Sequence, residues 1–471
     1  MIKFFDTLSG KLKDFDLPPG SEVKMYTCGP TVYDYAHIGN FRTFVFEDLL
    51  RRFLEYKGYK VKHVMNITDV DDKTIAGAQR EGKKLEDFTT HYTQAFNEDL
   101  KTLNILSPTK EPRATAEIQA MIFLVEKLVK NGAAYVSDGS VYYRVDSFKN
   151  YGKLSKKDLA KNIKGARVDV DEYKKEEGSD FALWKKAREG EPSWDSPWGK
   201  GRPGWHVECS AMSMKHLGET IDIHAGGEDL IFPHHENEIA QSEAATGKPF
   251  VKYWLHSKHL LVNGEKMSKS KCNFYTLRDL LAKDYDPTTI RHALLSVHYR
   301  QELNFTLHSL INSEAAIMKL DNCFASLNRN INDNVADNIA LSNLIRDGIE
   351  KIEESLSDDL KVSAALAWVF ECARAINRTV AERSCSTKDI KEAVTFFKRV
   401  DALFGFDISD VGVPPSNITR LLVEQQTLRK RGNFQEATKI RDQIIQKGWL
   451  VKDGKPDELS TVKQKRRAWD K

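Results

Sequence analysis

The sequence lacks long apolar runs, an N-terminal secretion signal and paired cysteines. No apolar stretch approaches the roughly 18 residues that a membrane span needs. Charges throughout "MIKFFDTLSGKLKDF" are incompatible with the apolar core of a signal peptide. The six cysteines are widely scattered and include no CxxC pair. These absences predict a cytoplasmic protein with reduced thiols and no membrane partner.

A strong charge imbalance is also missing. The formal net charge is +3, so charge alone does not indicate a nucleic-acid partner. What is present is the composition of a globular protein, with 41% apolar and 30% charged residues over 471 positions. This length is too great for one compact core and predicts about two to four domains.

The N-terminal region has the pattern strand, loop, helix, strand. The run "SEVKMYTC" predicts a strand ending at Cys28, and glycines and a proline break the next stretch, "GPTVYDYAHIGNF". Apolar residues then recur at helical spacing from Phe46 to Leu54 until Gly58, and "YKVKHVMNI" alternates like a strand. This βαβ unit predicts a parallel sheet with ligand-binding loops at its strand ends.

The rest of the chain divides into two further parts. A helix is predicted over about 112–131, and "YVSDGSVYYRV" predicts a hairpin that turns at Asp138 and Gly139. Residues 150–203 are charged and interrupted, as in an insertion, before "IDIHAGGEDLIF" returns to strand and glycine loop. From about 308 to 446 the periodicity is almost purely helical. We therefore expect an interrupted α/β domain followed by a helical half.

Two short stretches are suited to phosphate. "HIGN", residues 37–40, opens the first predicted helix, where unpaired N–H groups and the helix dipole favour an anion. Gly39 allows close approach, and His37 and Asn40 share a helical face. "KMSKS", residues 266–270, places lysines and serines in a loop able to wrap a polyphosphate. Either stretch alone is weak evidence for a phosphate site, because a histidine at a helix start is usually a cap and a lysine-rich loop is usually solvated surface.

Together, the two stretches resemble the HIGH and KMSKS signatures of class I aminoacyl-tRNA synthetases. The resemblance narrows to the cysteinyl-tRNA synthetase family in "CGPTVYDYAHIGN", "NITDVDDK", "RPGWHVECSAM", "IHAGGEDLIFPHHENEIAQSEA" and "KMSKSKCN", all within residues 28–273. One position departs from the signature, because Asn40 stands where a second histidine is usual. Asparagine can still donate to a phosphate oxygen, although it cannot become a cation.

The resemblance also implies a domain organisation. A Rossmann-like α/β catalytic domain would be followed by an all-α bundle and a small anticodon-binding domain. The expected bounds are 1–250 for the catalytic domain with an insertion at about 112–203, 251–307 for the KMSKS and stem-contact region, 308–410 for the bundle, and 411–471 for the anticodon-binding domain.

The stretch "FPHHENE", residues 232–238, carries half of a metal site by this resemblance. On a helix that begins near Pro233, His234 and Glu238 would share a face, and the three residues between them would point elsewhere. Spacing alone rarely indicates metal. The resemblance implies that Cys28 and Cys209 complete a zinc site. Since four protein ligands usually close a site, one weak ligand, such as Glu238, would have to admit the substrate sulfur.

The remaining roles also come from the resemblance. The resemblance implies that His37, Lys266 and Lys269 are the catalytic residues. ATP binding falls to His37, Gly39, Asn40, Gly227, Asp229, Lys266 and Lys269, and binding of the substrate cysteine to Gly29, Thr68, Trp205 and His224. The acids Asp69, Asp71 and Asp72 are expected to cap the next helix instead.

The implied reaction joins L-cysteine to tRNA(Cys) through cysteinyl-adenylate, with ATP and Mg²⁺, in a chain expected to act as a monomer. Zinc would select the thiolate over the serine hydroxyl, which makes a separate editing domain unnecessary. In the helical half, "RKRGNFQEATKIRDQIIQKGWLVKDG" resembles the family's last helical pair.

Three other interpretations remain. A ligase that joins cysteine to a small amine would have little need of the long helical half. A noncatalytic RNA-binding paralogue would have lost catalytic positions that are present here. A methionyl-type synthetase would carry its zinc in a cysteine-rich knuckle, and residues 150–203 contain no cysteine.

Overall fold

The computed structural model describes most of the chain. The described residues are 1–156, 180–268, 273–327, 335–382, 385–409, 416–447, 449–452 and 461–464. Within them, no helix combines the length and apolarity needed to cross a membrane.

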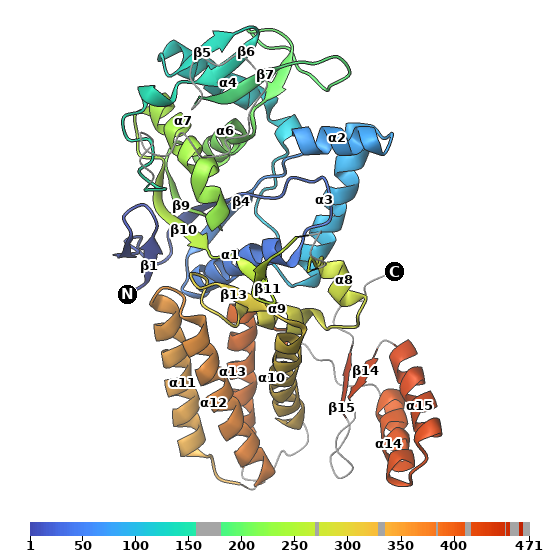
Figure 1. The fold of residues 1–471 in the computed structure, drawn as a ribbon. Coiled ribbons are helices and arrows are strands. Elements are labelled where there is room, and N and C mark those ends of the chain that lie inside the picture. Colours follow the sequence, from blue (N-terminus) through green and yellow to red (C-terminus); the bar gives the residue numbers. More distant parts are fainter. Residues whose placement is uncertain are drawn as a thin grey trace.

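A parallel sheet lies at the centre of the first half (Figure 1). Its described strands lie in the order β10 (Val251–Ser257), β9 (Ile221–Gly227), β3 (Glu22–Thr27) and β4 (Lys60–Met65). Met25 of β3 lies opposite His63 of β4 on one side and Ile223 of β9 on the other. The chain order reverses between β3 and β9, so the carboxyl ends of these strands border a crevice suited to a ligand. The predicted parallel βαβ unit is confirmed.

Helix α1 (Ile38–Tyr56) connects β3 to β4. His37 Nδ1 accepts the Asn40 N–H at 3.2 Å, and Asn40 Oδ1 accepts the His37 N–H at 3.1 Å. This reciprocal pair satisfies two backbone donors at the helix start. Phe41 and Phe53 are among the residues that bury one face, and Gly58, with φ of +88°, follows the helix end.

An inserted unit lies between β4 and β9; it begins before the predicted insertion of about 112–203 and ends after it, and those bounds stay a prediction. Its helices are α2 (Asp72–Arg80), α3 (Leu85–Thr102), α4 (Ile118–Lys130) and α6 (Trp205–Leu217), and its antiparallel sheet contains β5 (Ala134–Ser137), β6 (Ser140–Tyr143), β7 (Phe181–Lys186) and β8 (Gly201–Pro203). The β5–β6 hairpin turns at Asp138 and Gly139, whose φ angles of +48° and +78° suit a type I′ turn. Of the three expected caps, Asp71 caps α2, whereas Asp69 bonds Thr115.

Shorter elements flank the sheet. The N-terminal hairpin consists of β1 (Lys3–Asp6) and β2 (Lys11–Asp14), and a π-helical turn, η4 (Ile231–His235), leads into α7 (Glu236–Thr246). A small sheet of β12 (Glu265–Lys266), β11 (Leu260–Val262) and β13 (Leu303–Phe305) follows with α8 (Leu277–Leu281) and α9 (Pro287–Leu295). These elements bring the 266–268 segment beside the start of α1, where Gly39 faces Met267.

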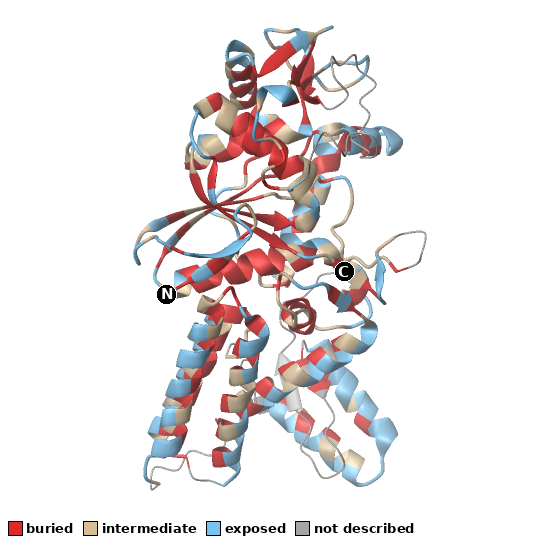
Figure 2. Cartoon of the chain, turned by 60° about the vertical axis from the view of Figure 1, so that its left-hand side comes forward, coloured by how far each residue is buried: buried red, intermediate tan, exposed pale blue. Residues whose placement is uncertain are grey.

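Where the structure describes the second half, it is helical apart from one antiparallel strand pair. Its elements are α10 (Leu307–Leu327), α11 (Ile339–Ser357), α12 (Val362–Ala381), α13 (Thr387–Phe404), α14 (Ser416–Lys430), α15 (Phe434–Gln446), β14 (Trp449–Lys452) and β15 (Thr461–Gln464). Buried residues line the inside of the α10–α13 bundle and exposed residues its outside (Figure 2). The β14–β15 pair was not predicted. The domain bounds stay predictions.

A buried ion cluster ties the bundle to the α/β half. Arg291 of α9 contacts the Asp48 carboxylate of α1 and donates to Phe404 O of α13 at 2.6 Å. Asp48 also accepts from Arg52 Nε at 2.7 Å. Burial works to raise the pKa of Asp48, but Arg291 and Arg52 outweigh it and lower this pKa below the usual aspartate value. The charges are therefore paired rather than isolated.

Candidate active site

A cavity of about 470 Å³ opens at the carboxyl ends of the parallel strands. Its wall includes Cys28 and Gly29 after β3, His37 and Gly39 at the start of α1, and Gly227 at the end of β9. Trp205, Asp229, Asn40 and Lys266 also line it. The reversal of strand order therefore produces a real cavity, and residues from distant parts of the sequence meet there.

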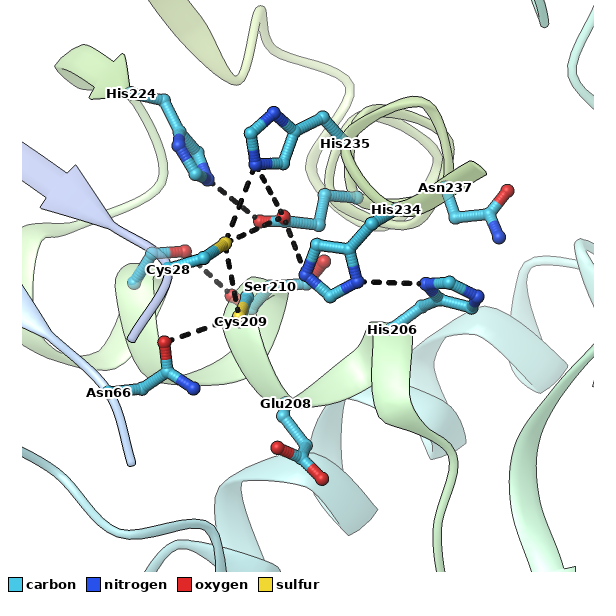
Figure 3. Close-up of polar contacts among 12 residues, drawn as sticks. Cys28, Asn66, His206, Glu208, Cys209, Ser210, His224, His234, His235 and Asn237 are labelled. Atoms are coloured by element: carbon cyan, nitrogen blue, oxygen red, sulfur yellow. Dashed lines mark hydrogen bonds and ion pairs between the residues drawn. The ribbon is translucent and has the colours of Figure 1, made fainter. Parts of the chain in front are cut away.

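The four residues linked to metal by the sequence converge at one edge of this cavity (Figure 3). Cys28 Sγ lies 3.7 Å from Cys209 Sγ and 3.8 Å from Glu238 Oε1, and His234 Nε2 lies 3.2 Å from Glu238 Oε1. Apart from Cys28, which borders the cavity, these side chains are almost completely buried. Donors bound to one tetrahedral zinc ion at about 2.0–2.3 Å would lie roughly 3.3–3.8 Å apart. The measured separations are close to that range.

The donor chemistry also fits a cation. Among the described residues, His234 Nε2 has no hydrogen-bond partner although it is buried and lies beside Glu238. The other ring nitrogen, Nδ1, lies 3.0 Å from His206 Nδ1, which fixes the direction of the ring. Such a second contact is typical of histidines that ligate metal. Thiolates, imidazole and carboxylate are the donors that zinc takes in proteins.

Burial shapes the ionisation of these groups. It raises the pKa of the Cys28 thiol well above its ordinary value, and the nearby Cys209 raises it further. Burial also raises the pKa of Cys209 and lowers that of His234 well below the usual range. The histidine is thus neutral, as a ligand must be, whereas the thiols need a neighbouring cation in order to ionise.

His235 also belongs to the cluster, contrary to the expectation that it would point away. Its Nε2 lies 3.4 Å from Cys28 Sγ, and the ring is fully buried. The helical argument failed because the chain is not a regular α-helix here: Phe232 has φ −141° and ψ 129° inside η4. Glu236 accepts N–H groups from Leu154 and Ser155 and therefore does point elsewhere.

The residues expected to bind cysteine occupy two different settings. Gly29 and Trp205 border the cavity, and Trp205 packs on His234 with ring centroids 4.3 Å apart. Thr68 and His224 are buried outside the cavity wall. Thr68 donates to Glu208 Oε2 at 2.7 Å, and His224 Nε2 lies 3.1 Å from Glu238 Oε2. Thr68 and His224 therefore contact neighbouring side chains and do not form part of the cavity surface.

Position 29 requires glycine because there is no room for a side chain, not because the backbone needs a conformation that only glycine adopts. A Cβ at this position would lie 1.6 Å from the backbone oxygen of Asn66. Asn66 in turn accepts the Gly29 N–H through Oδ1 at 3.0 Å, and the same oxygen lies 3.5 Å from Cys209 Sγ. The close approach of two strand ends therefore holds Cys28 next to Cys209.

The residues assigned to ATP are more open. His37 and Gly39 are partly exposed, and Asn40, Asp229 and Lys266 are exposed at the rim. The His37 ring stands edge-on to Phe274, with centroids 5.3 Å apart. Lys269 lies outside the described residues.

Sequence reasoning missed part of the cavity wall. Ser257 at the end of β10, and Lys258 and His259 directly after it, border the cavity, and Ser257 Oγ lies 2.9 Å from Thr43 Oγ1. The signal was available, because polar residues that follow a buried parallel strand lie at the same sheet edge as those after β3 and β9.

Comparisons with known proteins agree with this geometry. Residues 16–315 match the family described as "tRNA synthetases class I (C) catalytic domain", and residues 351–408 match the "DALR domain" family. A cysteine–tRNA ligase of Solibacter usitatus is 46% identical over 466 residues, covering 96% of this chain and 98% of the relative. One from Chlamydia muridarum is also 46% identical, with 96% and 97% covered.

Solved structures match in fold at much lower identity. Methionyl-tRNA synthetase from Mycobacterium tuberculosis, in complex with methionyl-adenylate, has a TM-score of 0.62 at 13% identity, with 83% of this chain and 93% of that chain covered. A ternary LeuRS–tRNA–LeuAMS complex from Agrobacterium radiobacter K84 has a TM-score of 0.60 at 11% identity, with 84% and 85% covered. On the family models and full-length relatives, the chain belongs to the cysteine–tRNA ligase family of class I aminoacyl-tRNA synthetases.

Proposed function

We propose that this ligase activates L-cysteine with ATP to cysteinyl-adenylate and pyrophosphate, and then transfers cysteine to the 3′-terminal ribose of tRNA(Cys). The observation that carries the proposal is the convergence of Cys28, Cys209, His234 and Glu238 at the edge of a cavity whose wall also holds His37 and Lys266. A sulfur-binding group and a phosphate-binding group thus face one space. That space is where the carboxylate of cysteine would meet the α-phosphate.

The four donors would hold zinc, which when bound supplies a bond to the substrate sulfur as a thiolate. Serine differs by one atom, and shape alone gives only a modest ratio between such substrates. A thiol ionises near neutral pH beside a metal, whereas a hydroxyl is a far weaker acid. Selection would therefore rest on bond chemistry, without an editing step. Trp205 packs against His234 on this side of the cavity.

On the nucleotide side, the chain mainly positions groups and stabilises charge. The start of α1 presents its positive dipole end to the cavity, and His37 lies there. Lys266 and Lys269 would neutralise the leaving pyrophosphate together with Mg²⁺. Binding both substrates in line converts a bimolecular attack into an oriented one, and this positioning acts together with charge stabilisation in phosphoryl chemistry.

The helical half would bind the tRNA. The α14–α15 helices and β14 share a small core of their own, made of Ile418, Leu422, Ile444, Trp449 and Val451. Exposed basic residues on the two helices, including Arg420 and Lys439, suit phosphate contacts. We further propose that the chain acts as a monomer in the cytoplasm.

The deciding experiment measures pyrophosphate exchange with cysteine, serine and methionine, followed by charging of tRNA. We expect exchange with cysteine only, and charging of tRNA(Cys). Exchange without charging of any tRNA would instead favour a ligase for small amines, and exchange with methionine would contradict the proposal. The Cys209→Ser variant should bind zinc more weakly than the native chain and should also activate cysteine more slowly, while native zinc affinity together with native activity would contradict the metal site.

A further inference from the structure

Cys28 has side chains able to ligate a metal on two sides (Figure 3), and Glu238 contacts a histidine in each set. On one side are Cys209 and His234. On the other side are His224 and His235, which with the same Cys28 and Glu238 form a second group of four donors within reach of one ion. Glu238 directs Oε1 toward His234, at 3.2 Å, and Oε2 toward His224, at 3.1 Å. The two groups therefore have two residues in common, Cys28 and Glu238, whose Sγ and Oε1 atoms lie 3.8 Å apart.

The separations in the second group suit a metal about as well as those in the first. His235 Nε2 lies 3.4 Å from Cys28 Sγ and 3.9 Å from Glu238 Oε1. Tetrahedral zinc places its donors roughly 3.3–3.8 Å apart. One thiolate, two imidazoles and one carboxylate are all ordinary zinc donors.

The His235 ring is held in the direction that such a role requires. Its Nδ1 lies 2.8 Å from His256 Nε2, and His256 Nδ1 lies 2.8 Å from Thr7 Oγ1. This chain of contacts leaves Nε2 facing Cys28. A Cβ at position 226 would lie 2.9 Å from His235 Cε1, so glycine there makes room for the ring. Second contacts of this kind orient metal-binding histidines.

We propose that Cys28, His224, His235 and Glu238 form a second position for a divalent metal ion, which overlaps the first and retains the ion when Cys209 is not available as a ligand. The inference rests on the proposed zinc site. It makes the two cysteines unequal: Cys28 serves both positions and Cys209 only one. A single closed site would instead make the loss of either thiolate similarly damaging.

The test compares alanine variants of the two cysteines in the full chain, loaded with Zn²⁺ alone and dialysed. Metal content and the number of sulfur neighbours from zinc X-ray absorption are the measurements. We expect two sulfurs in the native chain, about one metal ion with one sulfur in Cys209→Ala, and no retained metal in Cys28→Ala. Adding His235→Asn to Cys209→Ala should remove the ion. Adding His216→Asn, a histidine that pairs with Glu117 elsewhere, should not.

A more conservative change guards against misfolding. His256→Gln should lower zinc affinity about 10–100-fold in the Cys209→Ala chain, as loss of a supporting contact does, and leave the native chain unchanged. Circular dichroism checks that every variant folds. The inference is overturned if Cys209→Ala and Cys28→Ala lose zinc equally, or if His235→Asn has no effect in the Cys209→Ala chain. A native chain without zinc would overturn the proposed metal site itself, which distinguishes the two failures.

Discussion

The two sides of the cavity differ in how completely they are built. On the sulfur side, His234, His235 and Glu238 are at most 1% exposed, and neighbouring side chains hold each in place. On the phosphate side, Asn40 and Lys266 are exposed and lie at the rim. A site that distinguishes one atom from another needs fixed donors in a dry setting. Groups that meet a charged, departing phosphate can remain in water until the substrate arrives.

The largest effect is expected on the sulfur side. His234→Ala should lower kcat/KM for cysteine activation by more than about 100-fold, because even loss of a supporting contact to a metal ligand costs about 10–100-fold. His206→Asn, which removes the contact that orients His234 but no proposed metal ligand, should fall within that smaller range. Pyrophosphate exchange and metal content are the measurements. Equal effects of the two changes would mean that the cluster does not act through metal.

A substitution on the phosphate side should slow pyrophosphate exchange without changing the zinc content. Lys266→Ala removes one positive group and should slow pyrophosphate exchange by about 100-fold, a usual value for one stabilising donor. Zinc content should not change, because Lys266 lies apart from the donors. Lys11→Ala, an exposed lysine on β2, is the matched control and should leave both measurements unaltered.

Asn40 separates helix capping from phosphate binding. Asn40→Ala removes the acceptor for the His37 N–H and should cost about 0.5–1.5 kcal/mol of stability. Asn40→Asp keeps that acceptor but replaces the amide donor with a negative charge. It should melt like the native chain yet exchange pyrophosphate more slowly. If Asn40→Asp is fully active, the side chain serves only the helix.

The last effect concerns stability rather than activity and involves Glu47, on the helix that joins the two sides. Burial raises the pKa of this carboxyl well above the ordinary glutamate value of about 4.3, against the lowering effect of its bond with Thr27. The folded protein thus keeps a proton that the unfolded chain releases. Stability should decrease as pH rises above the ordinary value, by at most about 1.4 kcal/mol per pH unit.

Glu47→Gln should remove that slope and stabilise the protein at pH 8 more than at pH 4. Denaturant unfolding at a series of pH values measures both. Glu55→Gln, near the end of the same helix and paired with Arg51, is the comparison. An unchanged slope in Glu47→Gln would mean that another group holds the proton.

Local patterns were enough to predict much of the fold. Alternation and spacing gave β3, α1 and β4, and Asp138-Gly139 gave the hairpin, because each depends on residues close in sequence. The β14–β15 pair was missed because its strands are short and lie apart in the chain.

The arrangement of the site was harder to predict from the sequence than the fold was. Cys28 and Cys209 are 181 positions apart, and no spacing rule joins them; only the resemblance did. His235 was misplaced because helical geometry was assumed across a turn that is not regular. Thr68 and His224 were expected to contact the substrate, and that role stays a prediction; their burial outside the cavity wall could not be foreseen, because it depends on how distant elements pack.

The pairing of Arg291 with Asp48 and Phe404 limits where this chain can be divided. A fragment that ends before α13 would leave the Arg291 guanidinium buried without the Phe404 carbonyl. A buried donor without its acceptor lowers the stability of the fold. An end placed after residue 409 keeps every contact of this cluster, and the α14–α15 segment has its own core. The smallest soluble fragment that still forms the adenylate should therefore include α13, although that helix lies on the far side of α1 from the cavity.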